Sequence, residues 1–364
     1  MQAAGRAVLL LEDGTSWEGF GIGAGGTSIG EICFNTGMTG YQEIFTDPSY
    51  FGQIVVATHT HIGNYGIHKL ENQSEGIKIA GLVCKNFSEI FSRFDATETI
   101  QQWFVKQGVT GIQGVDTRAL VRHIRSKGAM NGIISNEITD EKALTQQLKG
   151  HPSMAGLELA SKVSTSKSYQ YGNITARYKV AVLDLGIKQH ILDSLAFRNC
   201  NMQVFPYNTP FSEMQRFEPD GFFISNGPGD PSVMTQSIET VKNMIGSNKP
   251  IFGICLGHQL LALANGISTY KMKYGHRGIN HPVKNLITGR CEITSQNHGF
   301  CVDDVQTKNN NAIEITHINL NDKTIEGIKM KGKSVFSVQY HPESSPGPHD
   351  SRYLFDEFIG MMER

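Results

Sequence analysis

The amino-acid sequence predicts an α/β protein of two domains. A β-rich, mixed amino-terminal domain is expected to precede a carboxyl-terminal domain with a doubly wound, mostly parallel sheet. The chain has 364 residues, which suggests about two domains of the usual size of ~150 residues. Between Pro152 and Tyr178 it lacks hydrophobic periodicity, and only after this stretch do short apolar strands alternate with amphipathic segments.

The expected first domain covers residues 1–151. The segment AVLLLEDGTSWEGFGIG contains two apolar strands around an Asp13-Gly14 turn, which predicts a β-hairpin. Helical patterns follow over residues 96–107 and 117–127. Residues 152–178, rich in Ser, Thr, Lys, Tyr and Gly, are expected to form a linker.

The expected second domain covers residues 179–364. KVAVLDLG, MQVFPYN, GFFISNGPGD and PIFGICLG indicate strands, and IKQHILDSLAF and VMTQSIETVKNMIG indicate helices between them. In such sheets ligands bind at the carboxyl ends of the strands. The loops after Ile224, Ile254 and Gln339 are therefore the expected location of a site.

Composition limits the class of partner. Lysine and arginine number 33 against 34 aspartate and glutamate residues, so no net field favours nucleic acid or a membrane surface. The apolar run over residues 7–11 is too short for a signal peptide or a membrane span. The six cysteines lack CxxC spacing, which is typical of free thiols in a reducing compartment. We expect a cytoplasmic protein whose partners are small molecules or another protein.

One cysteine lies at a predicted strand-to-helix turn. In FGICLGHQLLALA, Gly253 and Gly257 flank Cys255 with the G-x-C-x-G spacing of a nucleophile elbow. The glycines leave room for the turn, and the amino end of the following helix stabilises a thiolate and an oxyanion. A free cysteine is more often an inert buried residue, and that interpretation holds for Cys33, Cys84, Cys200, Cys291 and Cys301.

The candidate base lies in SVFSVQYHPESSPGPHD. A strand ends at His341, Pro342 turns the chain, and Glu343 is placed to accept the imidazole N–H. The alternative is a turn histidine whose ring bonds to the backbone. A third loop, SNGPGDP over residues 225–231, sets two glycines around a proline, so its N–H groups could face an oxyanion; the alternative is a plain β-turn.

Two further motifs do not predict a site. Residues 21–26 spell G-x-G-x-x-G, but a strand follows, so the helix that would bind a pyrophosphate is missing. His59 and His61 have the spacing of a metal pair, but no third ligand lies at a recognisable distance, so no metal is expected. His258 and His298 are expected to hold loops, because His341 already has the orienting carboxylate.

GICLGHQ, SNGPGDP and HPE together resemble the class I, triad-type glutamine amidotransferases over residues 179–364. CFNTGMTGYQEIFTDPSYFGQIV, GVDTRALVRHIRSKGAMNG, KMKYGHRGINHPVKN and SPGPHD resemble the small, glutamine-hydrolysing subunit of carbamoyl phosphate synthetase over essentially the whole chain. The resemblance implies that glutamine is hydrolysed through a cysteine thioester and that ammonia passes by an internal tunnel to a large synthetase subunit. That partner would make carbamoyl phosphate from bicarbonate and ATP for pyrimidine and arginine biosynthesis. No cofactor is expected on this chain, and ATP and Mg are expected on the large subunit.

The resemblance also implies roles for individual residues. Cys255 matches the nucleophile, His341 the base and Glu343 the residue that orients it. The N–H groups of Gly229 and Leu256 match the oxyanion donors. The expected glutamine-binding residues comprise these two and six others, Ser49, Gly227, Gln259, Asn297, Gly299 and Phe300, of which Ser49 would reach across from the first domain.

Two departures from the family pattern and two alternatives remain at this point. Ile279 lies in GHRGINHP where small residues are usual, and it matches no named role. Ser344 follows Glu343 where alanine is common, and its hydroxyl could add a hydrogen bond near Glu343. A chain with this fold could be a binding subunit without catalysis, but the joint presence of the three triad residues argues against it. It could also feed another acceptor, such as anthranilate, guanylate or cytidylate synthesis, or act as a γ-glutamyl hydrolase; GYQEIFTDPSY distinguishes these, because such relatives lack the first domain.

Overall fold

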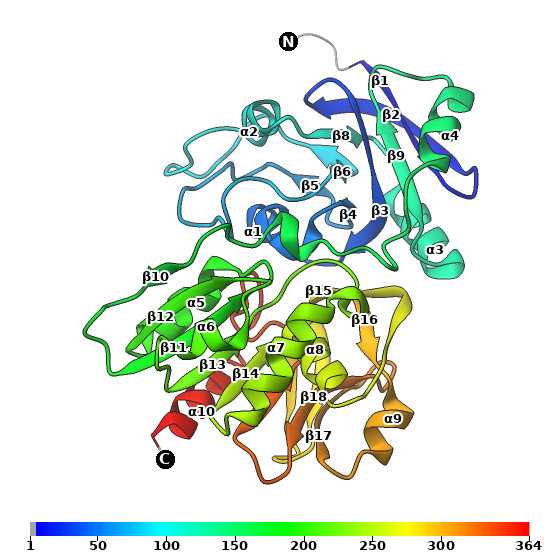
Figure 1. Ribbon diagram of the computed structural model, residues 1–364. Helices are drawn as coiled ribbons and strands as arrows, with labels where there is room; N and C mark the ends of the chain where they lie inside the picture. The colour runs from blue at the N-terminus through cyan, green and yellow to red at the C-terminus, as the bar shows by residue number, and fades with distance from the viewer. Residues whose placement is uncertain (1–4, 364) are drawn as a thin grey trace. The chain divides into compact units, whose positions relative to one another are not determined.

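The structure is a computed structural model that describes residues 5–363, and the chain divides into two compact units after Met154 (Figure 1). Residues 155–178, expected as a linker, pack with the second unit. Within this segment, β10 (Tyr169–Tyr171) joins the second sheet, and Glu158 forms an isolated bridge with Gly229.

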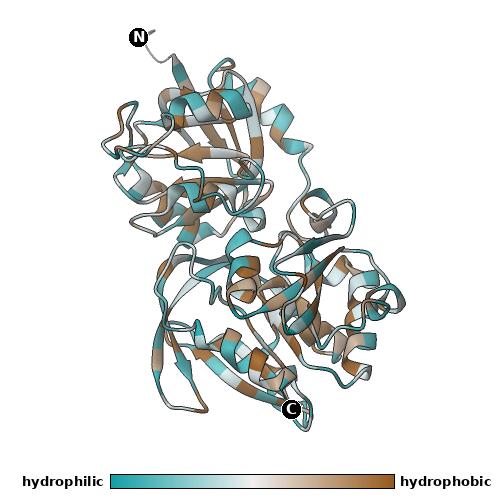
Figure 2. Cartoon of the chain, turned by 90° about the vertical axis from the view of Figure 1, so that its left-hand side faces the viewer, coloured by the Kyte–Doolittle hydropathy of each residue, from teal (hydrophilic) through white to brown (hydrophobic). Residues whose placement is uncertain are grey.

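The first unit contains a closed barrel in the order β1-β2-β8-β6-β4-β3-β9. Apolar residues lie along these strands and form the hydrophobic core of the unit (Figure 2). The barrel strands are β1 (Arg6–Leu11), β2 (Ser16–Gly23), β3 (Thr27–Asn35), β4 (Gln53–Ala57), β6 (Gly81–Val83), β8 (Thr110–Gln113) and β9 (Asn131–Ser135). The other elements are α1 (Tyr41–Thr46), the 3₁₀ turn η1 (Pro48–Tyr50), β5 (His61–Ile62), β7 (Asn86–Phe87), α2 (Ile100–Gln107), α3 (Thr117–Lys127) and α4 (Glu141–Lys149).

Local sequence signals explain most of these boundaries. The expected hairpin is confirmed, because β1 and β2 pair antiparallel around Asp13-Gly14. α3 covers the expected range, whereas α2 begins at Ile100 because Thr99 caps it in a capping box with Gln102. The G-x-G-x-x-G segment runs from β2 into β3, so a strand follows it, as expected.

The second unit contains a 10-stranded sheet in the order β10-β12-β11-β13-β14-β19-β18-β17-β15-β16. Its remaining strands are β11 (Tyr178–Asp184), β12 (Cys200–Pro206), β13 (Gly221–Ile224), β14 (Ile251–Ile254), β15 (Thr269–Asn285), β16 (Cys291–Val302), β17 (Ile313–Asn319), β18 (Ile325–Met330) and β19 (Val335–Val338). Its helices are α5 (Gln189–Phe197), α6 (Phe211–Gln215), α7 (Thr235–Gly246), α8 (Leu256–Ala264), α9 (Asp304–Asn309) and α10 (Tyr353–Met362), with 3₁₀ turns η2 (Ala160–Lys162) and η3 (Pro231–Val233).

The doubly wound, parallel part of this sheet is confirmed. Strands β12, β11, β13, β14 and β19 run parallel. One core lies between the sheet and helices α6, α7 and α8, and a second core lies between the other face and helices α5 and α10. The sheet then continues through antiparallel strands from β18 to β16, an extension that the strand–helix alternation did not indicate. The described helices include none with the length and apolarity needed to cross a membrane.

Candidate active site

Cys255 occupies a strained turn between β14 and α8. Its backbone has φ 54° and ψ −100°, a conformation that L-residues rarely adopt. A Cβ on Gly257 would lie 2.2 Å from the carbonyl oxygen of Ile224, and one on Gly253 would lie 2.9 Å from the carbonyl oxygen of Gly257. Both flanking positions therefore require glycine, because the neighbouring backbone approaches too closely for a side chain.

The thiol of Cys255 lies in a buried polar environment. Its exposed fraction is only 2%. The sulfur contacts the carbonyl oxygen of Asn297 at 3.6 Å, and Nε2 of Gln339 donates to the sulfur at 3.7 Å. Gln339 is the residue after β19 ends, so the parallel sheet brings this amide and the elbow together.

His341 follows the same strand, and two contacts fix it. Its backbone N–H donates to the carbonyl oxygen of Ser295 at 2.9 Å, and Nδ1 lies 2.8 Å from Oε1 of Glu343. Burial lowers the pKa of His341, but the charge of Glu343 and the Cys255 thiol outweigh it and raise the pKa to about 10. Since Glu343 occupies Nδ1, we infer that the effect of Cys255 acts through Nε2.

Lys188 is the functional residue that sequence reasoning missed. Its Nζ lies 2.8 Å from Oε1 of Glu343, and both side chains are at most 2% exposed. Nζ also donates to the carbonyl oxygen of Ser345 at 2.6 Å. Burial raises the pKa of Glu343, but Lys188 and then His341 outweigh it, and the net effect holds that pKa far below its usual range. Glu343 is therefore a carboxylate shared between Lys188 and His341, the candidate base.

The loop over residues 225–231 carries one expected oxyanion donor, Gly229, and the first residue of α8 is the other, Leu256. Gly229 has φ 94°, and a Cβ there would lie 2.7 Å from the carbonyl oxygen of Leu157. A Cβ on Gly227 would lie 2.1 Å from the carbonyl oxygen of Leu185. Within residues 5–363, the N–H groups of Gly229 and Leu256 have no hydrogen-bond acceptor. Both donors are thus available to a ligand.

The expected glutamine-binding residues divide between the units. Asn297, Gly299 and Phe300 lie on β16, and Nε2 of Gln259 donates to the carbonyl oxygen of Phe300 at 2.9 Å. The amide of Gln259 thereby holds the strand that contacts the thiol. Ser49 lies on η1 in the first unit, where its N–H donates to Oδ1 of Asp47 at 2.9 Å, and its reach to glutamine stays a prediction.

Two neighbouring histidines were expected to hold loops but bond to strand residues instead, His258 to β19 and His298 within β16. Nδ1 of His258 bonds Oγ of Ser337 at 2.9 Å, and burial lowers the pKa of His258 to about 3. Nδ1 of His298 bonds the carbonyl oxygen of Phe300 at 2.8 Å, and burial keeps its pKa well below the ordinary value. Ser344 forms the hydrogen bond expected near Glu343, because its hydroxyl donates at 3.2 Å to the carbonyl oxygen of Pro342, the residue before Glu343.

Within the described part of the chain, one group has the geometry of a metal site. Ligand atoms of His276, His298 and Glu326 all lie within 4.8 Å of one another. However, Nε2 of His276 lies 2.8 Å from Asp322 and Nδ1 lies 3.5 Å from Glu326. Burial lowers the pKa of His276, but these carboxylates outweigh it and raise the pKa to about 9, so a metal ion at this position would have to displace a proton from the ring.

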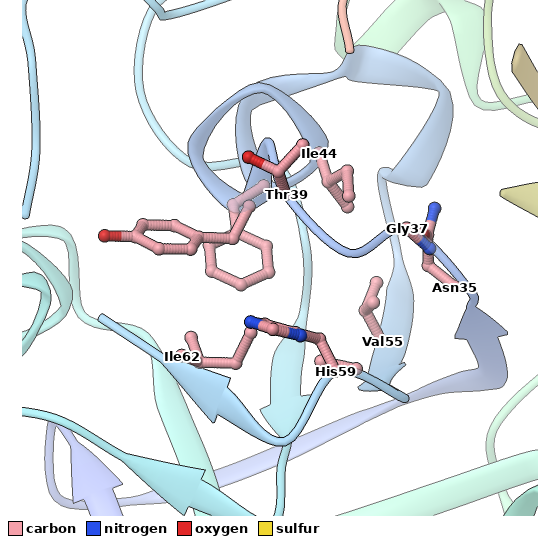
Figure 3. A pocket seen from close by; sticks show the side chains of 10 residues that line it. Asn35, Gly37, Thr39, Ile44, Val55, His59 and Ile62 are labelled. Atoms are coloured by element: carbon pink, nitrogen blue, oxygen red, sulfur yellow. The ribbon is translucent and has the colours of Figure 1, made fainter. Parts of the chain in front are cut away.

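His59 and His61 lie in different environments. His59 lies in the wall of a small cavity of about 20 Å³ beside Val55 and Ile62 (Figure 3), whereas His61 is exposed. Burial lowers the pKa of His59. Neither histidine belongs to a metal-capable group among residues 5–363.

A cysteine elbow and a histidine–glutamate pair at the carboxyl ends of neighbouring parallel strands define a cysteine-dependent hydrolase site. Residues 181–361 match the sequence model of "Glutamine amidotransferase class-I", so this unit is a class-I glutamine amidotransferase domain. Residues 9–134 match "Carbamoyl-phosphate synthase small chain, CPSase domain".

Full-length relatives give the same assignment. The chain is 48% identical over 360 residues to the carbamoyl phosphate synthase small chain of Chlorobaculum tepidum, covering 98% of each chain. It is 47% identical over 369 residues to that of Thermus thermophilus, covering 98% of this chain and 93% of the relative. The chain belongs to the carbamoyl phosphate synthase small-chain family. Among solved structures, a glutamine amidotransferase from Thermotoga maritima aligns with a TM-score of 0.36 and 17% identity, covering 45% of this chain and 75% of that one.

Proposed function

We propose that this chain hydrolyses glutamine through a Cys255 thioester. Nε2 of His341 takes the thiol proton, and the sulfur attacks the side-chain amide carbon of glutamine. The resulting oxyanion accepts hydrogen bonds from the N–H groups of Gly229 and Leu256. The C–N bond breaks as His341 returns the proton to the leaving nitrogen, which departs as ammonia. Water, deprotonated by His341, then cleaves the thioester to glutamate and restores the thiol.

One observation supports this proposal most directly. Glu343 orients the ring of His341, and His341 follows the strand next to the turn that carries Cys255. The 2.8 Å contact between Glu343 and Nδ1 fixes the ring, so Nε2 is the nitrogen free to exchange protons with sulfur. The raised pKa of His341, about 10, supports a ring that keeps the transferred proton until the leaving nitrogen accepts it. A structural cysteine would not need this arrangement.

We further propose that the ammonia passes through an internal tunnel to a large synthetase chain. There it would react with bicarbonate and ATP, with Mg and ATP bound on that partner, to give carbamoyl phosphate for pyrimidine and arginine synthesis. Membership in the small-chain family supports this assignment over the other acceptors, because the family match extends over residues 9–134 of the first unit. Near-neutral composition and free cysteines support a cytoplasmic location.

The test is glutaminase turnover of the purified chain, alone and with the large chain, ATP and bicarbonate. We expect a low rate that rises on mixing, with carbamoyl phosphate formed. The Cys255→Ala variant should lose glutamine-dependent synthesis while the complex still uses free ammonia. Turnover of glutamine by the variant would refute the nucleophile. Unchanged hydrolysis without carbamoyl phosphate would indicate another acceptor, and no hydrolysis by the wild type would indicate a binding subunit.

A further inference from the structure

The first unit carries a basic groove at the carboxyl ends of three of its strands. β4, β6 and β8 are adjacent and parallel, and the residues after them line an open cavity of about 740 Å³. The charged residues of this basic groove are Lys85, Asp116, Arg118, Arg122 and Arg125. Four cations thus face one carboxylate in a chain whose net charge is −1.

Helix α3 presents three of these cations along one side. Arg118, Arg122 and Arg125 follow i, i+4, i+7 spacing, which places them on one helix face, while Leu120 and Ile124 are buried on another. From Arg118 to Arg125 the row extends about 10 Å at the helical rise of ~1.5 Å per residue. The positive charge of the groove is therefore spread along α3 and is not concentrated at one position.

Among the described residues, three of the four cations of the groove have no ion-pair partner. Lys85, Arg118 and Arg122 are exposed and form no ion pair or side-chain hydrogen bond within residues 5–363. Asp116 is already engaged, because its Oδ1 accepts from the N–H of Ala119 at 3.0 Å. By contrast, the exposed Arg6 and Lys106 of the same unit are paired with Glu18 and Glu98.

We propose that this groove docks an acidic surface segment of the large synthetase chain. The inference rests on the proposed function, which supplies that partner. An extended row of exposed cations complements a row of carboxylates, whereas a small-anion site would have converging, buried donors. The groove belongs to the first unit, and none of its lining residues is among the expected glutamine-binding residues.

Charge complementarity at an exposed rim acts mainly on association, and salt screens it. Reversing two of the cations should therefore weaken the complex strongly at low ionic strength and less at high ionic strength. The catalytic residues all lie in the second unit, so glutamine hydrolysis by the isolated chain should not change.

The experiment compares full-length wild type with Arg118→Glu/Arg122→Glu by calorimetric titration into the large chain at ~0.05 M and ~0.5 M salt. The matched control is Lys142→Glu/Lys149→Glu, which makes the same charge change on α4, outside the groove. We expect the groove variant to raise Kd about tenfold or more at low salt, with the difference shrinking at high salt, and the control to change Kd about twofold at most. Lys85→Ala, on a different loop, should weaken binding in the same direction and tests the groove where the double variant misfolds.

Equal Kd values for the groove variant and wild type, or equal weakening by the control, would overturn the proposal. Weakening that is independent of salt would also overturn it. A wild-type chain that does not bind the large chain would instead refute the proposed partner. Inorganic phosphate, added as a competitor at constant ionic strength, should leave Kd unchanged; a rise in Kd would indicate a small-anion site and overturn the docking assignment.

Discussion

Replacing Lys188 by methionine tests whether its buried ammonium stabilises the carboxylate of Glu343. The substitution keeps the length of the side chain but removes the ammonium 2.8 Å from Oε1 of Glu343. Both groups are almost completely buried, and breaking one partner out of a buried pair costs about 3–5 kcal/mol. We expect the free energy of unfolding of the Lys188→Met variant to fall by about that amount in urea denaturation at neutral pH.

The same substitution should alter the pH dependence of glutamine hydrolysis. Lys188 is the strongest influence that lowers the pKa of Glu343, so removing it lets Glu343 protonate at higher pH. The acid limb of the pH–rate profile should move up by at least about one unit, since ~1.4 kcal/mol corresponds to one unit. Lys188→Arg keeps the charge and should retain most of the acid limb.

A double variant separates the charge from packing. Lys188→Met/Glu343→Gln removes both buried charges, so its unfolding free energy should exceed that of Lys188→Met, although it should remain poorly active. A loss under about 1 kcal/mol for Lys188→Met, with an unchanged acid limb, would refute the role assigned to Lys188.

Three further outcomes follow from the site. Gly257→Ala should abolish hydrolysis and lower the unfolding midpoint in urea, because its Cβ would meet the carbonyl oxygen of Ile224 at 2.2 Å; normal activity would contradict the elbow geometry. Cys255→Gly should be about 1 kcal/mol more stable than Cys255→Ala by the same denaturation, because it relieves the positive φ; equal stability would contradict strain. The pKa values of His341 and His276 are raised to about 10 and about 9, so the folded chain keeps protons that the unfolded chain releases above about 6.5. This stabilisation is complete below about pH 6.5 and is lost as pH rises through 9 to 10, so the urea midpoint should fall over that range, and a rising midpoint would contradict it.

The elbow could be predicted from sequence because its signals are local. Strand PIFGI, the two glycines and the helix after Cys255 lie within a few residues, and the structure places them as expected. The pairing of His341 with Glu343 is also local, since the residues are two apart and Pro342 fixes the turn between them. Each of these features depends on backbone geometry that short sequence patterns encode.

The antiparallel half of the second sheet was not predictable in the same way. β15 is 17 residues long and contains glycines, histidines and a proline, with register shifts against β16. Neither period-2 alternation nor a turn signal marks its course. β15 forms a hairpin with β16, but its register shifts and its pairing with β17 depend on contacts that no short sequence pattern marks.

Lys188 shows why a buried partner is the hardest site residue to infer. It follows strand β11, whose end lies beside β13, one strand removed from the elbow strand β14. In the sequence it is an ordinary lysine before an amphipathic helix, a position that usually faces solvent. Only the folded sheet brings its ammonium to Glu343, 155 residues later in the chain. The one signal available was position: Lys188 follows a parallel strand on the edge where the three predicted loops also end, so polar residues there are expected to converge.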